Sequence, residues 1–128
     1  MEELTIGEVS RRTGLRTSAL RYYEAEGILP APRRVNGRRR YDSSIIPMVA
    51  LLQFAKHAGF TLSEIRKLFH GFSVETPLGE RWRSLARAKL EELDQLINRA
   101  TRMKHAIELG RRCGCARVEE CVLTAKGG

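Results

Sequence analysis

The sequence predicts a mainly α-helical protein with a helical head, a small β wing, one long helix and a short cysteine-containing tail. Three observations predict this fold. Segments with helical periodicity and capping residues fill most of the first seventy positions, and an Asn-Gly pair interrupts them. A heptad pattern then runs from about Glu80 to about Gly110. All three cysteines follow within nine positions, in the stretch RRCGCARVEEC.

Length and charge limit the class of protein. The chain has 128 residues, the size of one small domain joined to an extended element. It carries 23 Lys and Arg against 15 Asp and Glu, and the net charge of +8 favours nucleic acid over a membrane as partner. The sequence has no apolar run long enough for a membrane span and no secretory signal, so we expect a cytoplasmic protein without a membrane partner.

The first two predicted helices form a helix-turn-helix. In LTIGEVSRRTGL, Thr5 is a candidate N-cap and Gly14 ends the helix. In RTSALRYYEAEGIL, Thr17 or Ser18 is the candidate N-cap and Gly27 ends the helix. Two short helices joined by a tight glycine-containing turn are typical of DNA-binding proteins, in which the second helix enters the major groove.

A basic β hairpin, the wing, follows the second helix. The segment PAPRRVNGRRRYD breaks the helical periodicity with two prolines, and its Asn36-Gly37 pair is a strong signal for a tight hairpin turn. The first 41 residues contain nine arginines and no lysine, which suits planar contacts to phosphate or guanine. We therefore expect the wing to bind phosphates, with an affinity that falls steeply with salt.

Two helices are predicted between the wing and the long helix. Asp42 or Ser43 can cap the segment SSIIPMVALLQFAKHAG, in which Pro47 lies in the tolerated first turn and Gly59 ends the helix. A Thr-x-x-Glu capping box opens the next helix, TLSEIRKLF, at Thr61.

The long helix follows a loop at 71–79 and carries a heptad seam. The seam consists of Trp82, Ala86, Lys89, Leu93, Leu96, Ala100, Met103 and Ile107, with Lys89 as the misfit. A short chain has little core of its own to cover such a seam. We therefore expect a homodimer through residues 80–110, with Trp82 packed at the interface.

These segments resemble the winged helix-turn-helix head of MerR-family transcriptional regulators. The likeness rests on LTIGEVSRRTGLRTSALRYYEAEGIL, NGRRRY and AGFTLSEIRKLF, in the family's order and spacing. It implies a DNA-binding head at 1–75, an antiparallel coiled-coil dimerisation helix at 76–110 and an effector-binding tail at 111–128. It also implies that the protein is not an enzyme, and that the dimer binds double-stranded promoter DNA, where RNA polymerase engages it.

The resemblance and the helix-turn-helix geometry assign a DNA-binding surface. Arg21, Tyr22 and Tyr23 stand where the family touches DNA. The Arg21 guanidinium can donate two hydrogen bonds to a phosphate or a guanine edge, and the tyrosine hydroxyls can hydrogen-bond to phosphates. Tyr23 is also spaced to lie in the core, three residues after Leu20. The predicted DNA-binding residues are Arg16, Thr17, Ser18, Arg21, Tyr22, Tyr23, Arg33, Arg34, Asn36, Arg38, Arg39, Arg40 and Tyr41.

The three cysteines are candidate ligands, and two chemistries stay open. Cys113, Cys115 and Cys121 suit a soft metal ion of the zinc, Cu(I) or mercury class, because such ions prefer thiolates. The tail also resembles that of the SoxR-like redox sensors of the family, in which four cysteines hold a [2Fe-2S] cluster. Gly110 stands where the first of those four should lie, so a cluster here needs a fourth ligand from elsewhere.

Glu119, Glu120 or the partner chain could supply that fourth ligand. We expect regulation through a soft metal ion as the leading function, in which effector binding at the tail changes the distortion of promoter DNA. A SoxR-like iron-sulfur regulator is the first alternative. A basic architectural DNA-binding protein with structural zinc is another, and so is a thiol oxidoreductase using Cys113 and Cys115, which would leave the head without a role.

Overall fold

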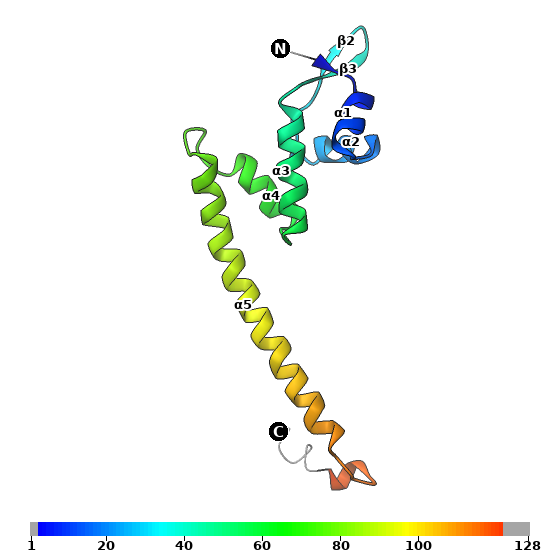
Figure 1. Cartoon of the computed structure of the whole chain (residues 1–128), viewed down its shortest axis with the longest axis vertical. Helices are drawn as coiled ribbons and strands as arrows, with labels where there is room; N and C mark the ends of the chain where they lie inside the picture. The colour runs from blue at the N-terminus through cyan, green and yellow to red at the C-terminus, as the bar shows by residue number, and fades with distance from the viewer. Residues whose placement is uncertain (1–2, 122–128) are drawn as a thin grey trace. The chain divides into compact units, whose positions relative to one another are not determined.

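A computed structural model describes residues 3–121 and confirms a mainly α-helical chain with a small β wing and a long helix (Figure 1). Positions 1–2 of the predicted head and 122–128 of the predicted tail lie outside the described residues. The elements are β1 (Glu3–Leu4), α1 (Ile6–Thr13), α2 (Thr17–Ala25), β2 (Arg33–Val35), β3 (Arg38–Asp42), α3 (Ile45–His57), α4 (Leu62–His70), α5 (Leu78–Arg111) and the 3-10 helix η1 (Val118–Glu120).

The chain divides into two compact units within α5, between Leu85 and Ala86. The first unit, which we call the head, holds the sheet, α1 to α4 and the first turns of α5. The second unit holds the rest of α5 and the segment that carries the cysteines. Over residues 3–121, none of the helices combines the length and the apolar character that a bilayer crossing requires.

Helix α1 begins and ends as its capping residues predict. The Thr5 hydroxyl accepts a hydrogen bond from the Glu8 backbone N–H at 3.1 Å, and Glu8 Oε1 accepts one from the Thr5 backbone N–H at 3.3 Å. Gly14 ends the helix with a φ of 76°, which a residue with a Cβ adopts only with strain.

Helix α2 begins one residue earlier than predicted. Arg16 occupies the N-cap position with an extended backbone, and no side chain caps the helix, so the prediction of Thr17 or Ser18 as N-cap is wrong. Leu15 packs against the core, and the turn after α1 is therefore already complete at Arg16. The helix ends at Ala25, and Gly27, the predicted stop, directly follows the C-cap Glu26 with a φ of 75°.

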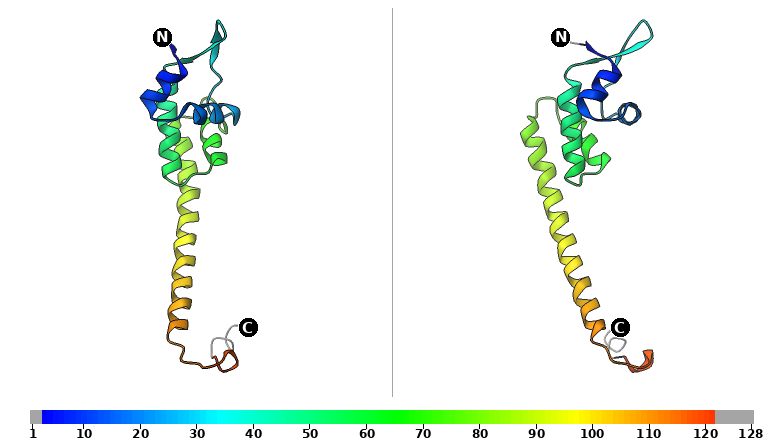
Figure 2. Two further views of the ribbon diagram at one scale, coloured as in Figure 1. Left: turned by 90° about the vertical axis from the view of Figure 1, so that its right-hand side faces the viewer. Right: turned by 45° about the vertical axis from the view of Figure 1, so that its right-hand side comes forward.

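The wing is part of a three-stranded antiparallel sheet of order β1-β3-β2. Asn36 and Gly37 have φ angles of 53° and 76°, the positive values that the predicted tight turn requires. Strand β1 was not predicted; it pairs Leu4 with Tyr41 and is too short to show an alternating pattern. Both views of Figure 2 show the β2–β3 hairpin projecting from the helical part of the head.

Helices α3 and α4 also have local start signals. The Asp42 side chain accepts a hydrogen bond from the Ser44 backbone N–H at 2.9 Å, and this bond lowers the pKa of Asp42. The N-cap position itself is Ser44 instead of the predicted Asp42 or Ser43, because β3 extends to Asp42. Helix α4 begins with the predicted capping box between Thr61 and Glu64.

An apolar core lies where α1 packs against α2, α3 and β3, with α4 against α3. Trp82, from the first turns of α5, packs at its edge, with its ring centroid 5.4 Å from that of Phe54 and 5.1 Å from that of Phe60. Trp82 thus packs against α3 and against the segment between α3 and α4, and its predicted place at a dimer interface stays a prediction. The buried core residues are Leu4, Val9, Leu20, Tyr23, Ile28, Leu29, Tyr41, Ile45, Val49, Leu52, Ala55, Phe60 and Ile65.

Helix α5 begins two residues before the predicted start. The Pro77 carbonyl accepts hydrogen bonds from the backbone N–H groups of Glu80 and Arg81, at 3.0 and 3.2 Å, so the helix starts directly after this proline. Lys89, the misfit of the seam, is 7% exposed, and its ammonium lies 2.7 Å from the Glu92 carboxylate. The coiled-coil pairing of α5 stays a prediction.

Candidate functional site

A basic groove lies between the wing and the helix-turn-helix. It has a volume of about 380 Å³. Its lining residues are Thr5, Ile6, Arg21, Arg34, Gly37, Arg38, Arg39 and Arg40. Arg21 comes from α2 and the other arginines from β2 and β3, so the fold brings arginines of the helix-turn-helix and of the wing together in one groove. None of these lining residues is acidic, and the groove is therefore a surface that attracts phosphates.

Several of the other predicted DNA-binding residues reach the surface. Arg16 and Ser18 are exposed and Thr17 is half-buried, while Asn36 is exposed in the hairpin turn. Tyr22 is 48% exposed, and its ring lies edge-on to that of the next tyrosine. These side chains are therefore accessible to a ligand.

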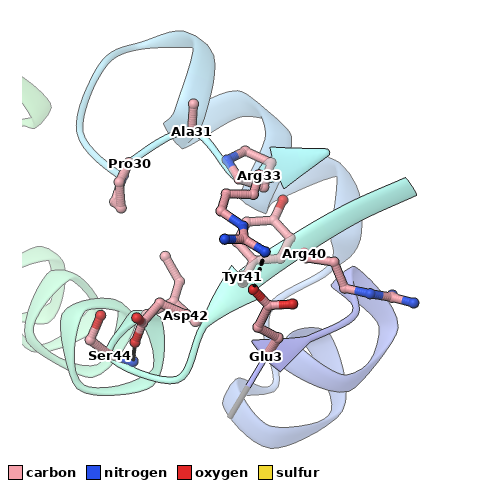
Figure 3. A pocket seen from close by; sticks show the side chains of 10 residues that line it. Glu3, Pro30, Ala31, Arg33, Arg40, Tyr41, Asp42 and Ser44 are labelled. Atoms are coloured by element: carbon pink, nitrogen blue, oxygen red, sulfur yellow. Dashed lines mark hydrogen bonds and ion pairs between the residues drawn. The ribbon is translucent and has the colours of Figure 1, made fainter. Parts of the chain in front are cut away.

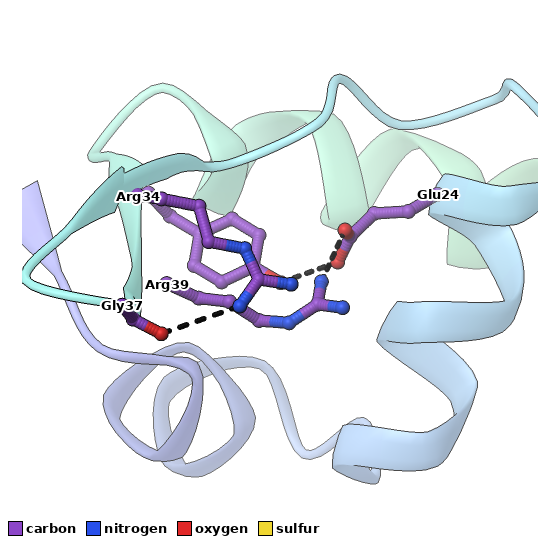
Figure 4. A network of polar contacts seen from close by, with 5 residues as sticks. Glu24, Arg34, Gly37 and Arg39 are labelled. Atoms are coloured by element: carbon purple, nitrogen blue, oxygen red, sulfur yellow. Dashed lines mark hydrogen bonds and ion pairs between the residues drawn. The ribbon is translucent and has the colours of Figure 1, made fainter.

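Figure 4 shows Glu24 of α2 in contact with Arg39 of β3, and Tyr41 of β3 also contacts Glu24. Arg39 Nη1 lies 2.6 Å from Glu24 Oε1, and the Tyr41 hydroxyl donates a hydrogen bond to Glu24 Oε2. The Glu24 side chain is only 9% exposed, so water screens this contact weakly. Arg34 Nη1 donates to the Gly37 carbonyl at 3.3 Å in the same region. The network fixes the wing on the second helix of the helix-turn-helix.

The network also shifts two pKa values. Burial, together with the hydrogen bond to Glu24, raises the pKa of Tyr41 to about 12. The hydrogen bond to Tyr41, with further support from Glu24, raises the pKa of Arg39. Tyr41 is therefore a neutral donor and Arg39 a permanent cation at any physiological pH.

Two of the predicted DNA contacts lie in the core of the head. Tyr23 is 5% exposed and Tyr41 is 2% exposed. The Tyr23 hydroxyl accepts a hydrogen bond from Lys56 Nζ at 2.8 Å, and the same ammonium lies 5.5 Å from the Tyr23 ring centroid. The sequence left open whether Tyr23 is a core or a contact residue, and the structure gives it a core position. A contact of either tyrosine with DNA stays a prediction.

Arg33 lies apart from the basic groove, in the lining of a second cavity of about 330 Å³ (Figure 3). Arg33 Nη2 lies 2.7 Å from Glu3 Oε1, and both side chains are largely exposed, so this ion pair contributes little to stability. Arg40 lines both cavities. The remaining lining residues of the second cavity are Pro30, Ala31, Pro32, Tyr41, Asp42, Ser44 and Ile45.

The three cysteines come together after α5. Their Sγ atoms all lie within 4.8 Å of one another, and the Sγ atoms of Cys113 and Cys121 are 3.4 Å apart. The 3-10 helix η1 turns the chain back, and Cys115 Sγ donates a hydrogen bond to the Glu120 carbonyl at 3.5 Å. Arg117 pairs with the Glu120 carboxylate at 3.0 Å on the same turn. Cys113 and Cys115 are exposed and Cys121 is half-buried, so all three side chains reach the surface at least in part.

This spacing fits a soft metal ion. Thiolate sulfurs that bind zinc at about 2.3 Å in a tetrahedron lie about 3.8 Å from one another. The Sγ atoms of Cys113 and Cys121 are 3.4 Å apart and all three lie within 4.8 Å of one another, which is close to this value. Within residues 3–121, the group of side chains placed to hold an ion consists of these three cysteines, and Glu119 and Glu120 do not join it.

Sequence reasoning missed the partners of the predicted DNA-binding residues. Glu24 offered a signal, because it is an acidic residue on a helix whose role in DNA binding favours positive charge. Lys56 and Glu3 offered none, since they lie 33 and 30 positions from Tyr23 and Arg33 in the sequence.

Comparisons with known proteins agree with this geometry. A family model described as MerR HTH family regulatory protein matches residues 4–71, and a second, described as MerR, DNA binding, matches residues 48–109. The HTH-type transcriptional activator SoxR homolog of Chromobacterium violaceum is 32% identical over 126 residues, which cover 96% of this chain and 85% of that protein. The HTH-type transcriptional regulator HmrR of Rhizobium leguminosarum is 31% identical over 105 residues, which cover 82% and 81%.

Solved structures show the same fold. The transcription regulator PbrR691 from Ralstonia metallidurans, in complex with lead(II), has a TM-score of 0.71 and 25% identity, over 98% of this chain and 99% of that chain. HiNmlR, a MerR family regulator lacking the sensor domain and bound to promoter DNA, has a TM-score of 0.59 and 24% identity, over 81% and 80%. The matched families and relatives are transcriptional regulators and not enzymes. This chain belongs to the MerR family of DNA-binding transcriptional regulators.

Proposed function

We propose that this MerR-family member is a dimeric regulator that distorts promoter DNA in response to a soft metal ion held by Cys113, Cys115 and Cys121. The observation that carries the proposal is the approach of three thiols to within 4.8 Å of one another. Thiolates select zinc, Cu(I) and related soft ions over hard cations such as magnesium or calcium. The relatives include the Mercuric resistance operon regulatory protein of Serratia marcescens, and the similar PbrR691 was solved with lead(II), which supports this class of effector.

The basic groove supplies the DNA contacts in this proposal. Arg21 on α2 reaches base edges or phosphates in the major groove, while Arg34, Arg38 and Arg40 neutralise phosphates beside it. Arg39 is already paired with Glu24, so its main part is to hold the wing in place. We assign further contacts with the DNA backbone to Arg16, Thr17, Ser18, Tyr22, Arg33 and Asn36.

The exposed apolar side chains of α5 support dimerisation through residues 80–110. Leu90, Leu96, Ile97, Met103 and Ile107 are 55 to 63% exposed in the single chain. Fully burying such a side chain contributes about 1.5–3 kcal/mol relative to leaving it in water. A second copy with the same stripe covers these residues as an antiparallel coiled coil.

Three regions of the chain have different functions in this proposal. Residues 1–75 bind DNA, residues 76–110 dimerise, and residues 111–128 hold the effector. A smooth bend of a promoter-sized duplex costs on the order of 1–6 kcal/mol, so the protein state that bends it must be favoured by a comparable amount. An effector shifts that balance by its difference in affinity for two protein states. The three cysteines receive the effector, the heads impose the DNA shape, and RNA polymerase engages the resulting promoter.

Anaerobic purification followed by elemental analysis and a visible absorption spectrum tests the metal assignment. We expect the chain to bind one zinc, Cu(I) or mercuric ion when these ions are titrated, and a variant with serine at all three cysteine positions to bind none. Two irons per chain with absorption between about 400 and 550 nm would contradict a single metal ion and indicate an iron-sulfur cluster.

A SoxR-like iron-sulfur regulator is the second candidate. The observation in its favour is the relative named as a SoxR homolog, which matches 96% of this chain. A [2Fe-2S] cluster takes four ligands, whereas the described part of the chain gathers three thiols and has Gly110 at the first position of the four-cysteine pattern. The partner chain would therefore have to complete the site.

A further inference from the structure

Arg81 fastens the start of α5 to the end of α4 through all the donors of its side chain. A guanidinium has five N–H donors. Nε makes one hydrogen bond, and Nη1 and Nη2 make two each. The acceptors are the backbone carbonyls of Leu68, Phe69, Ser73, Val74 and Thr76, at 2.9 to 3.5 Å.

These contacts have an electrostatic basis. Leu68 and Phe69 lie in the last turn of α4, where carbonyl groups lack partners within the helix and carry partial negative charge. A cation near such a terminus is favourable, and hydrogen bonds from a charged donor are stronger than neutral ones. The Arg81 side chain therefore acts as a cap for α4, although it belongs to the helix that follows.

The loop between α4 and α5 depends on this side chain for its shape. Val74 is 94% exposed, so it does not anchor the loop in the core. Gly71 permits the tight exit from α4, because a Cβ there would lie 2.6 Å from Lys67 Cγ and 2.7 Å from the Lys67 carbonyl. The Arg81 side chain, in the first turns of α5, donates hydrogen bonds to the loop carbonyls of Ser73, Val74 and Thr76. These bonds fasten the loop to the start of α5.

The neighbouring residue fastens α5 on the apolar side. Trp82 contacts Phe54 and Phe60, whose ring centroids lie 5.4 and 5.1 Å from its own. The first turns of α5 are thus held by a polar contact to the end of α4 and an aromatic contact to α3. Both contacts lie within the head.

We propose that Arg81 is a positioning residue that makes the first turns of α5 move as one body with the DNA-binding head, and that it thereby transmits the state of the cysteine tail to the DNA. The second part rests on the proposed function, since it takes its signal from the cysteines. Helix α5 is continuous from Leu78 to Arg111. A displacement of such a helix reaches the head only when the connecting loop is fixed, because a loose loop absorbs the motion as a hinge.

The substitution Arg81→Lys tests the clamp while it keeps the positive charge. A lysine ammonium is a single point donor and cannot bind carbonyls spread over two segments. Arg83→Lys is the matched control, because Arg83 lies two residues further along the same helix and is exposed. Both variants make the same chemical change, so a difference between them reports the carbonyl contacts of Arg81.

Hydrogen–deuterium exchange on the full metal-free chain is the first measurement. We expect the amides of residues 72–76 to exchange about tenfold faster in Arg81→Lys than in the wild type and in Arg83→Lys. Amides of α2 should keep their wild-type rates, which excludes a general loss of folding. Equal rates in the loop of all three proteins would overturn the clamp.

DNA distortion is the second measurement, made on a duplex that the wild type selects from random sequences and that carries a fluorescent dye at each end. Zinc, Cu(I) and mercuric ions are the probes. We expect Arg81→Lys to keep wild-type affinity for DNA and for the metal, and to lose the metal-dependent change in energy transfer between the dyes. A wild-type response in Arg81→Lys overturns the transmitting role. A wild type that binds no probe metal overturns the proposed function and the transmission together, while the exchange rates still decide the clamp.

Discussion

The guanidinium of Arg39 lies 2.6 Å from the carboxylate of Glu24, and this ion pair fastens the β wing to the second helix of the helix-turn-helix. Glu24 is an acid close to the basic groove, where its charge alone would oppose DNA binding. Its contacts with Arg39 and Tyr41 set the position of the wing arginines relative to Arg21.

Glu24→Gln therefore should weaken DNA binding, although it removes a negative charge. We expect a loss of about three- to tenfold in affinity, the scale of one net hydrogen bond. Fluorescence anisotropy with a selected duplex measures it. Glu26→Gln is the control, because Glu26 pairs with Arg66 at a more exposed position, with the two side chains 40% and 42% exposed. A gain in DNA affinity for Glu24→Gln would show that the negative charge of Glu24 affects DNA binding more than its contacts with Arg39 and Tyr41 do.

Tyr41 should make the stability of the head sensitive to alkaline pH. Its pKa is raised from 10.0 to about 12 in the folded chain. Below pH 10 the phenol is protonated in both the folded and the unfolded state. Between pH 10 and 12 the unfolded chain loses the proton first, so the free energy of unfolding falls, by at most about 1.4 kcal/mol per pH unit.

Urea unfolding of the wild type and Tyr41→Phe across this pH range measures the contribution. The phenylalanine variant is expected to have a shallower decline above pH 10, because it has no phenol to ionise. Its stability at neutral pH should be lower, since Glu24 loses a donor. Parallel curves for the two proteins would refute the assignment.

The groove arginines should set the salt dependence of DNA binding. Each phosphate contact contributes about 0.9 to the slope of log affinity against log salt concentration. Arg38→Ala is expected to lower the magnitude of that slope by about this amount and to weaken binding to all sequences alike. Arg87→Ala on α5 removes the same charge outside the groove and should leave the slope nearly unchanged.

The exposed stripe of α5 should control the oligomeric state. Leu96→Glu places a charge among side chains that we expect to be buried between two chains, and it should shift the protein from dimer to monomer. Sedimentation velocity at several concentrations measures the shift. Gln95→Glu adds the same charge one residue earlier, off the seam, and should remain dimeric. A dimeric Leu96→Glu would place the interface elsewhere.

Cys113→Ser should separate effector sensing from DNA binding. The serine hydroxyl replaces a soft thiolate with a hard oxygen, so the affinity for zinc, Cu(I) or mercuric ions is expected to fall at least about tenfold. Affinity for the selected duplex should stay at the wild-type value, because the groove lies in a different unit of the chain. Loss of DNA binding would indicate that the cysteines have a structural role.

The ends of the helices in the head were largely predictable because their signals are local. Thr5, Gly14 and Thr61 act on backbone groups within four residues of their own position, and the Asn36-Gly37 pair needs only its own two dihedral angles. The errors at α2, α3 and α5 are shifts of one or two residues. They arise where packing, an adjoining strand or a proline decides the boundary.

The contacts of the site were less predictable. The arginines of α2 and the wing could be assigned to one surface from the helix-turn-helix geometry, but Glu24 and Lys56 take part only because folding brings distant segments together. The cysteines were assigned to one site from their clustering in the sequence. Their approach depends on the turn at η1, for which the sequence has no periodic signal.

The basic groove has a chemical property that is useful in the laboratory. Its charged lining consists of arginines alone, and the chain has no lysine among its first 41 residues. Succinimidyl ester dyes and lysine crosslinkers will therefore label the protein without modifying a side chain of the groove, whereas dicarbonyl reagents such as phenylglyoxal will attack the groove itself. Acetylation of lysines in a cell would likewise leave the charge of this surface intact.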